Sequence, residues 1–447
     1  MKIGGFFSSK IFPILLVNFI GILGYSIVIP ILIYIVQDLG GNGFIYGILG
    51  AMYPLFQFIG APILGRLSDK IGRKKVLIIS QAGTFVAWLL FLIAFLLPKT
   101  ALWAQESEFT GSYLMTLPLL FIFLARIFDG FTGGNISVAN AYLSDISTDE
   151  NRKKNFGQMG ASTSLGFVLG PAVAGLLAST FLGEVLPLLL AAVISLIAIV
   201  VIVTRLKESN PCVVDTGDIS LKSFRRMFQV EHKDCFLEGS EEFQDDNPVS
   251  LMNILKIKEL PLLYSIYFLT FLAFSLFYAG LPIYASTGLN WTAVELGIFL
   301  AYSSFIMILV QGPLLSKIAP IFSSEQLIIA GALLLSIGFS LLMSKQLLII
   351  YLGNTLLSIG NGIMWASFLA VLSGTGPKRL QGTIQGYGNS MGSAASMIGL
   401  VLGGILFERL STTVFALGGA IFLIIVVLMG FHFVKGRRTK NPIPSIS

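Results

Sequence analysis

Residues 65–75 read Gly65-Arg66-Leu67-Ser68-Asp69-Lys70-Ile71-Gly72-Arg73-Lys74-Lys75, with five cations and one acid in eleven positions. Long apolar segments flank this stretch on both sides. A short basic segment between two membrane spans marks the side of the bilayer that faces the cytosol. The stretch therefore predicts a multi-pass membrane protein and indicates its orientation.

The composition points the same way. The 447 residues are 55% hydrophobic and 12% charged, with a mean hydropathy of +0.85. A soluble domain would carry about 25% charged residues. The first apolar segment, residues 11–36, is too long for the apolar core of a cleaved signal peptide. We therefore expect an all-α membrane protein.

Twelve segments are long and apolar enough to be spans, since about 20 helical residues cross the hydrocarbon core. We expect these spans at residues 11–36, 44–65, 75–97, 115–143, 156–181, 184–204, 260–286, 293–315, 325–344, 346–373, 383–407 and 411–434. The spacing predicts four parts. They are a six-helix bundle (1–204), a cytosolic linker (205–258), a second six-helix bundle (259–436) and a cytosolic tail (437–447). In the linker, the apolar residues of 221–228 have helical spacing among cations, which favours an interfacial helix.

The two bundles show signs of a repeat. Three glycines of the fifth span recur at one constant offset in the eleventh span: Gly157, Gly170 and Gly175 against Gly386, Gly399 and Gly404. Two pseudo-symmetric halves with a site between them near the midplane are a transporter arrangement.

The net charge of +6 follows from this topology and does not indicate nucleic-acid binding. Both termini are expected in the cytosol. Of the 29 Lys and Arg residues, all but Lys99, Arg126, Lys345 and Arg409 then face the cytosol. That asymmetry is a strong positive-inside signal.

Enzymatic and metal-binding motifs are absent from the sequence. Cys212 and Cys235 fall in the predicted linker, where they should be reduced thiols, and His232 near Cys235 lacks further ligands. There is no Ser/His/Asp set and no phosphate-binding loop, so we expect no enzyme, no metal and no cofactor. Without an ATP-binding motif, transport would be driven by a gradient.

The fourth span contains Arg126 and Asp129, which share a helix face at i,i+3 spacing. Ionisable groups in a span cost about 2.5–3.5 kcal/mol each on insertion scales and persist where they pair or face a polar cavity. The pair is a candidate for proton coupling, with Asp129 as the carrier. Asn140 falls close to Asp129 on the helical wheel. The alternative is an ion pair that only fixes helix packing.

Polar side chains on other spans are candidates for a substrate cavity. Amides, hydroxyls and aromatic rings between apolar walls suit an uncharged or weakly charged amphipathic ligand. The candidates are Asn18, Tyr25, Gln57, Asn140, Tyr267, Tyr278, Asn354, Ser358, Asn361, Trp365, Gln385 and Asn389. The alternative for each is an interhelical hydrogen bond.

The fifth span supplies a packing motif of small residues and one proline. Its members are Gly166, Gly170, Pro171 and Gly175. Glycines let another helix approach closely, and the proline permits a kink.

Together with residues 46–62 and 141–145, the basic stretch and the fifth-span motif resemble the tetracycline-efflux subfamily of major facilitator superfamily transporters. The resemblance covers most of residues 12–180. It implies the major facilitator fold, drug:proton antiport by alternating access, and the cytoplasmic membrane of a bacterium. It also implies a conformational latch made by Gly65, Asp69, Gly72, Arg73 and Asp145, and a proton-coupling role for Arg126. In that latch Asp69 would dock at the start of the eleventh helix, and Arg73 would link Asp69 to Asp145.

Two departures from the subfamily concern its substrate. Tetracycline exporters carry acids in the first and third helices where this chain has Gly21 and Ala87. A site without these carboxylates fits a cationic metal–drug chelate poorly.

We therefore expect a monomeric exporter whose partners are a small amphipathic molecule, protons and the lipid bilayer. An uptake symporter or facilitator on the same scaffold is the alternative. A receptor or scaffold acting through the linker is a third possibility.

Overall fold

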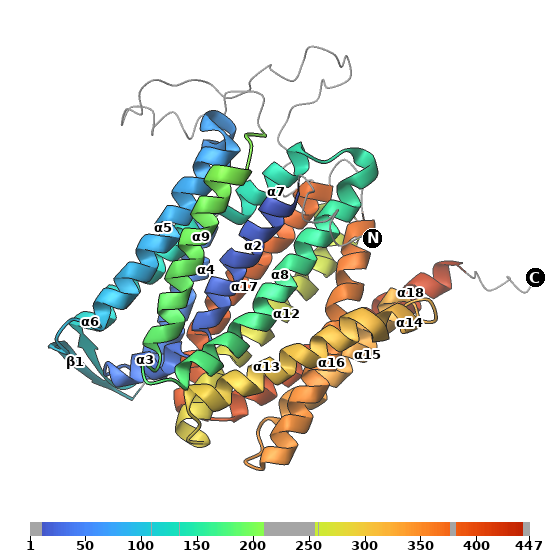
Figure 1. Cartoon of the computed structure of the whole chain (residues 1–447). Coiled ribbons are helices and arrows are strands. Elements are labelled where there is room, and N and C mark those ends of the chain that lie inside the picture. Colours follow the sequence, from blue (N-terminus) through green and yellow to red (C-terminus); the bar gives the residue numbers. More distant parts are fainter. Residues whose placement is uncertain are drawn as a thin grey trace, which may run out of the picture. The chain divides into compact units, whose positions relative to one another are not determined.

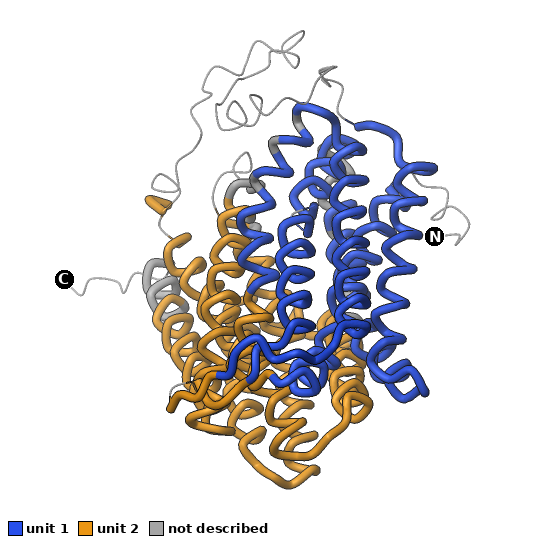
Figure 2. Tube along the Cα trace, turned by 90° about the vertical axis from the view of Figure 1, so that its left-hand side faces the viewer, with its two compact units in different colours: residues 1–40, 52–104, 114–248 blue, residues 41–51, 105–113, 249–447 orange. Residues whose placement is uncertain are grey.

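The computed structural model describes residues 11–108, 110–133, 135–209, 255–257, 259–375 and 381–440. The predicted interfacial helix at 221–228 and the end of the tail lie outside these residues. The chain divides into two compact units (Figure 2). Unit 1 comprises residues 1–40, 52–104 and 114–248, and unit 2 comprises 41–51, 105–113 and 249–447. The predicted boundaries at 204 and 259 stay predictions.

The first part of the chain folds into helices and one β-hairpin (Figure 1). The elements are α2 (Phe12–Val28), α3 (Leu32–Asp38), α4 (Gly43–Ile71), α5 (Arg73–Ala94), β1 (Ala101–Ser107), β2 (Gly111–Thr116), α6 (Leu117–Thr132), α7 (Asn135–Asp145), α8 (Asp149–Ala178) and α9 (Val185–Arg205). Helix α4 begins in unit 2 and continues in unit 1.

The rest of unit 2 is helical in its described residues. The elements are α12 (Leu260–Ile283), η2 (Tyr284–Gly288), α13 (Ala293–Leu309), η3 (Val310–Leu314), α14 (Leu315–Ile318), α15 (Ser324–Leu341), α16 (Leu347–Gly374), α17 (Gln381–Leu410) and α18 (Thr413–Lys440). Both η elements are single turns of π-helix.

Ten helices in the described residues are long and apolar enough to cross a membrane, which confirms the all-α membrane fold. An eleventh span forms if α2 and α3, bent by 42° at their junction, are taken together. Pro30 lies at that junction, where its missing N–H interrupts the helix. The predicted span 293–315 is divided into α13 and the π-turn η3. The total of twelve spans stays a prediction.

The basic stretch is a helix junction rather than a loop. Helix α4 continues to Ile71 and α5 begins at Arg73, so Gly72 alone interrupts them. Gly72 has φ of +103°, a conformation that side chains with a Cβ rarely adopt. The carboxylate of Glu208 accepts hydrogen bonds from the backbone N–H groups of Arg73 (2.8 Å) and Lys74 (3.0 Å). The first backbone N–H groups of a helix have no acceptor within that helix, so the carboxylate of Glu208 stabilises the N-terminus of α5.

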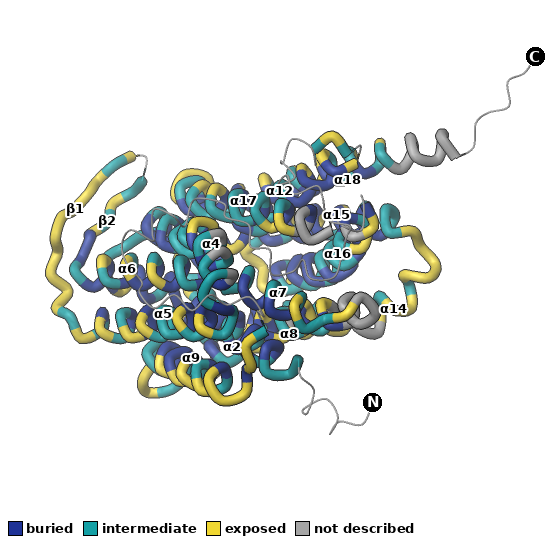
Figure 3. The backbone as a smooth tube through the Cα atoms, turned by 90° about the horizontal axis from the view of Figure 1, so that it is seen from above, coloured by how far each residue is buried: buried dark blue, intermediate teal, exposed yellow. Residues whose placement is uncertain are grey.

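A β-hairpin precedes the fourth span, which was expected at 115–143. Strands β1 and β2 pair in a two-stranded sheet ahead of α6, and β1 is exposed along most of its length (Figure 3). The span itself corresponds to Leu117–Asp145, whose described parts are α6, up to Thr132, and α7, from Asn135. Sequence hydropathy did not register the hairpin.

The same kind of helix crossing recurs in each unit. In unit 1, α2 packs on α8, and the hydroxyl of Ser26 donates to the carbonyl oxygen of Gly166 at 2.8 Å. A Cβ on Gly170 would collide with Ser26. In unit 2, α12 packs on α17, where a Cβ on Gly399 would lie 2.6 Å from the Cβ of Ser275. One glycine pair of the predicted repeat, Gly170 and Gly399, thus stands at similar helix contacts.

Candidate functional site

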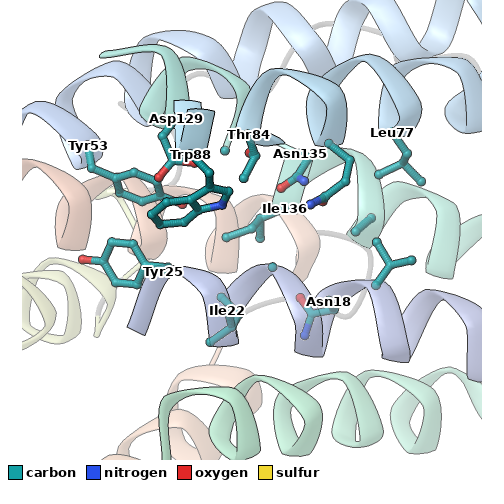
Figure 4. Close-up of a pocket in the computed structure, with 15 residues that line it drawn as sticks. Asn18, Ile22, Tyr25, Tyr53, Leu77, Thr84, Trp88, Asp129, Asn135 and Ile136 are labelled. Carbon is teal, nitrogen blue, oxygen red and sulfur yellow. The ribbon is translucent and has the colours of Figure 1, made fainter. Parts of the chain in front are cut away.

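A small pocket of mixed polar and apolar lining lies inside unit 1, between α2, α4, α5, α6 and α7 (Figure 4). Its volume of about 30 Å³ is enough for water-sized groups. The polar and aromatic residues that line it are Asn18, Tyr25, Tyr53, Gln81, Thr84, Trp88, Asp129 and Asn135. It is the one place in the described part of unit 1 where a buried carboxylate meets a cavity.

Asp129 and Arg126 form a loose pair behind this pocket. Each is only 3% exposed, and they are the buried charged residues of the described chain. Arg126 Nη1 lies 3.9 Å from Asp129 Oδ2, which is too long for a hydrogen bond. Asp129 Oδ2, Arg126 Nη1 and Arg126 Nε have no hydrogen-bond partner among the described residues. The carboxylate lines the pocket and the guanidinium does not.

The guanidinium of Arg126 packs on an aromatic ring instead. Its Cζ atom lies 5.5 Å from the centroid of the Phe91 ring. Phe91, on α5, is fully buried, and its ring centroid lies 5.7 Å from that of Trp88. A cation over a desolvated ring face is held by the quadrupole of the ring. Arg126 therefore has an electrostatic partner other than Asp129.

Close approach of α4 to α6 places Tyr53 at the pocket. A Cβ on Gly130 would lie 2.6 Å from the Tyr53 carbonyl oxygen, so glycine permits this distance. The rings of Tyr53 and Tyr25 are 4.5 Å apart. Gln57 Nε2 donates to the Tyr53 hydroxyl (3.3 Å) and to the Gly133 carbonyl (3.1 Å). Gln57 therefore supports the pocket without lining it.

Asn18 touches the pocket but its amide is engaged elsewhere. Its Nδ2 donates to Ser162 Oγ at 2.7 Å and to Thr163 Oγ1 at 2.8 Å, both on α8. These are interhelical hydrogen bonds, the alternative weighed for the polar candidates. Asn140 is partly buried on α7 and is not among the lining residues. Its place in a substrate cavity stays a prediction.

Three lining residues of α5 were not among the predicted candidates. Gln81, Thr84 and Trp88 lie at i, i+3 and i+7, on one helix face. Gln81 Nε2 has no partner among the described residues, and Trp88 Nε1 donates to Ser195 at 3.1 Å. The signal that marks them is a polar stripe inside the apolar segment 75–97.

Unit 2 holds an uncharged aromatic and amide cluster. The Tyr267 hydroxyl donates to Asn389 Oδ1 at 2.8 Å. Trp365 meets the Tyr267 ring edge-on at 5.2 Å, and the Phe271 ring stacks on Tyr267 at 5.0 Å. The structure thus brings together three predicted cavity residues from α12, α16 and α17. The Gln385 side chain lies outside the described part.

Other candidates in unit 2 are engaged away from this cluster. Asn354 accepts from Ser303 at 2.5 Å and donates to the Phe299 carbonyl at 3.2 Å, both on α13. Asn361 Nδ2 lies 3.3 Å from Met307 Sδ, also on α13. Of the remaining two candidates, Ser358 is buried and Tyr278 is exposed. The amide stripe of α16 therefore serves the α13–α16 contact in part.

Two of the predicted latch residues lie in contact near the helix junction. Arg73 Nε lies 3.2 Å from Asp145 Oδ2, and Arg73 Nη1 donates to Ser68 Oγ at 2.6 Å. Ser209 also donates to Asp145 Oδ2, at 3.0 Å. Gly65 lies opposite Ser137, and the Asp69 side chain is outside the described part. The latch role stays a prediction.

The fifth-span motif lies on α8 where that helix meets α2. A Cβ on Gly166 would lie 2.9 Å from Ile22. Pro171 lies inside the helix, and both it and Gly175 are buried. Close helix packing is the role this geometry supports.

Comparison with known proteins gives a family match over most of the chain. The Major Facilitator Superfamily profile matches residues 14–324 and 263–446. Tetracycline resistance protein, class C, of Escherichia coli is 26% identical over 410 residues, covering 90% of this chain and 91% of that protein. Multidrug resistance protein 2 of Bacillus subtilis is 25% identical over 413 residues, covering 90% and 89%.

Solved structures give the same fold. The human organic anion transporter MFSD10 superposes with a TM-score of 0.64 at 18% identity, covering 94% of this chain and 98% of that one. The D-xylose–proton symporter superposes with a TM-score of 0.70 at 14% identity, covering 94% and 97%. At these identities the likeness concerns the fold alone.

Proposed function

Because this chain belongs to the Major Facilitator Superfamily, we propose that it exports small amphipathic molecules by proton antiport and alternating access. It is a multi-pass membrane transporter rather than an enzyme. The single observation that supports proton coupling is Asp129. Its buried carboxylate lines a pocket and has one oxygen without a hydrogen-bond partner in the described chain.

Proton exchange at Asp129 would change the charge of the buried pair. With Asp129 ionised, the pair with Arg126 is neutral overall; with Asp129 protonated, it carries one positive charge. A ligand or proton that favours one of two conformations shifts their populations by its differential binding. In this proposal protonation of Asp129 selects one access state and release of the proton selects the other.

The proposed cargo is uncharged or weakly charged. The cluster of Tyr267, Trp365 and Asn389 offers rings and an amide rather than ions. Relatives named for tetracycline and multidrug resistance support export. The absence of the subfamily's acids at Gly21 and Ala87 argues against a cationic chelate as cargo.

We also propose the membrane orientation of the protein and the contact that holds one access state. The charge asymmetry of the sequence supports the cytoplasmic membrane with both termini in the cytosol. The ion pair of Arg73 with Asp145 would latch one access state. We propose a monomer as the working unit.

The test is exchange in proteoliposomes whose lumen is acidic. Tetracycline and neutral fluorescent amphipathic dyes are added outside, and luminal pH and dye uptake are followed together. We expect wild-type protein to accumulate a compound while the lumen becomes more alkaline, and Asp129→Asn to lose this coupling. Asp38→Asn is the matched control, because Asp38 is exposed and pairs with Lys99 at 2.8 Å.

Three outcomes would contradict parts of the proposal. Exchange that survives Asp129→Asn would remove this residue as the carrier. Compound that equilibrates without proton movement would indicate a facilitator. Protons and compound that move in the same direction would indicate the uptake symporter that the sequence left open.

A further inference from the structure

We propose that Phe91 is a positioning residue that holds the Arg126 guanidinium away from the Asp129 carboxylate and so keeps Asp129 able to exchange protons. This inference rests on the proposed function, in which Asp129 is the proton carrier. Phe91 lies on α5 and would act through Arg126 rather than by direct contact with the proton or the cargo.

The geometry shows an arginine divided between two partners. Arg126 Cζ lies 5.5 Å from the Phe91 ring centroid, while Nη1 lies 3.9 Å from Asp129 Oδ2. Neither that nitrogen nor that oxygen has a hydrogen bond in the described chain. At i,i+3 spacing on one helix the two side chains are long enough to meet directly. Their separation therefore needs a cause, and the ring is the group in contact with the guanidinium.

The consequences of removing the ring follow from electrostatics. A guanidinium that donates directly to a carboxylate forms a strong charge-assisted hydrogen bond. Such a bond favours the ionised acid and lowers the pH at which the acid takes up a proton. The cation–π contact with Phe91 competes with this bond, because a desolvated cation is attracted to the ring face. Loss of the ring frees Arg126 to close the gap.

Of the other groups that face Asp129, Thr84 on α5 hydrogen-bonds its carboxylate, and Phe91 is the group that contacts the guanidinium. Across the pocket the titratable side chains are Tyr25 on α2 and Tyr53 on α4, and the polar ones on α5 are Gln81 and Thr84. None of these is positively charged. Arg126 is the one cation near the carboxylate in the described chain, so its position is one of the influences on the proton affinity of the site, beside burial and the Thr84 hydrogen bond.

Phe91 is also rigidly placed for this role. It is fully buried, and its ring lies beside Trp88, whose indole N–H is fixed by Ser195 on α9. A ring in such packing keeps one orientation, so the guanidinium meets a fixed surface.

The experiment reads the protonation of Asp129 without transport. Trp88 lines the pocket with Asp129, so its fluorescence reports charge there. In full-length protein with Trp103, Trp291 and Trp365 replaced by phenylalanine, the emission of Trp88 is titrated with pH. Phe91→Leu, Phe91→Tyr and the background protein are compared, and Asp129→Asn identifies the transition. Phe339→Leu, at another fully buried phenylalanine, controls for loss of packing.

We expect the midpoint of the Asp129 transition to fall by about one pH unit in Phe91→Leu, a tenfold change in proton affinity. Phe91→Tyr, which keeps the ring, and Phe339→Leu should keep the original midpoint. An unchanged midpoint in folded Phe91→Leu would overturn the proposal, as would equal shifts in Phe91→Leu and Phe91→Tyr. If exchange proves uncoupled from protons while the midpoint still moves, the proposed function fails and the role of Phe91 remains.

Discussion

The two units use one packing scheme around different interiors. In unit 1, α8 crosses α2 with Gly170 against Ser26, and in unit 2, α17 crosses α12 with Gly399 against Ser275. Yet unit 1 buries Arg126 and Asp129, whereas the polar centre that unit 2 shows in its described residues is the neutral cluster around Tyr267. The shared crossing fixes the scaffold, and the interior residues are free to differ. The buried charged pair and the neutral aromatic cluster thereby lie in different units.

The largest expected difference between the two units is the cost of removing a buried polar side chain. Arg126→Leu leaves an uncompensated carboxylate in unit 1, and we expect a loss of about 3–5 kcal/mol in unfolding free energy. Asn354→Leu, a buried amide in unit 2, leaves only neutral partners unpaired and should cost about 1–3 kcal/mol. Thermal and denaturant unfolding in detergent measure both. The double variant Arg126→Leu/Asp129→Asn should recover part of the loss, and equal effects of the two single variants would remove the contrast.

The next prediction concerns the glycines at the helix crossing that both units share. Gly170→Leu and Gly399→Leu should each destabilise the protein by about 1–3 kcal/mol, because the added side chain meets another helix. Unfolding temperatures of the two variants measure this. Matched controls on the same helices are Gly160→Leu and Gly386→Leu, where a Cβ meets nothing within 4 Å. A large effect at only one of the crossings would contradict their equivalence.

Hydropathy predicted most of the scaffold closely. The expected spans 184–204 and 346–373 correspond to α9 (Val185–Arg205) and α16 (Leu347–Gly374). Long apolar runs are unambiguous because an unpaired backbone cannot lie in lipid. The single-residue junction at Gly72 and the hairpin of β1 and β2 escaped, because both depend on local backbone geometry that hydropathy does not record.

The sequence predicted the charged pair of the site and two of its neutral lining residues, Asn18 and Tyr25. Asp129 and Arg126 stand out because ionisable residues are rare in spans. Gln81 and Thr84 were overlooked among the neutral polar residues of α5, and Phe91 is an ordinary apolar residue until the structure places a guanidinium over it. Such roles arise from contacts between helices, which one sequence does not display.

The neutral cluster of unit 2 gives the smallest expected effect. Tyr267→Phe removes the hydroxyl that donates to Asn389 but keeps the ring. If the cluster contacts cargo, affinity should fall by about 0.5–1.5 kcal/mol, the net value of one hydrogen bond. Binding and exchange assays at several pH values should show this loss with an unchanged pH profile. Tyr264→Phe, which loses a similar bond to the Ile384 carbonyl, is the control. A shifted pH profile would mean that both units share the coupling.

The one-residue junction at Gly72 has a practical consequence for mapping which side of the membrane a segment faces. Trypsin cuts after lysine and arginine, and residues 65–75 offer five such targets. Proteases attack chain that is mobile or locally opened, and a helix capped by Glu208 opens rarely. The most basic stretch of the molecule should therefore resist digestion from either side. Protection there would report helical structure, and an epitope or label at this position would be a poor marker of topology.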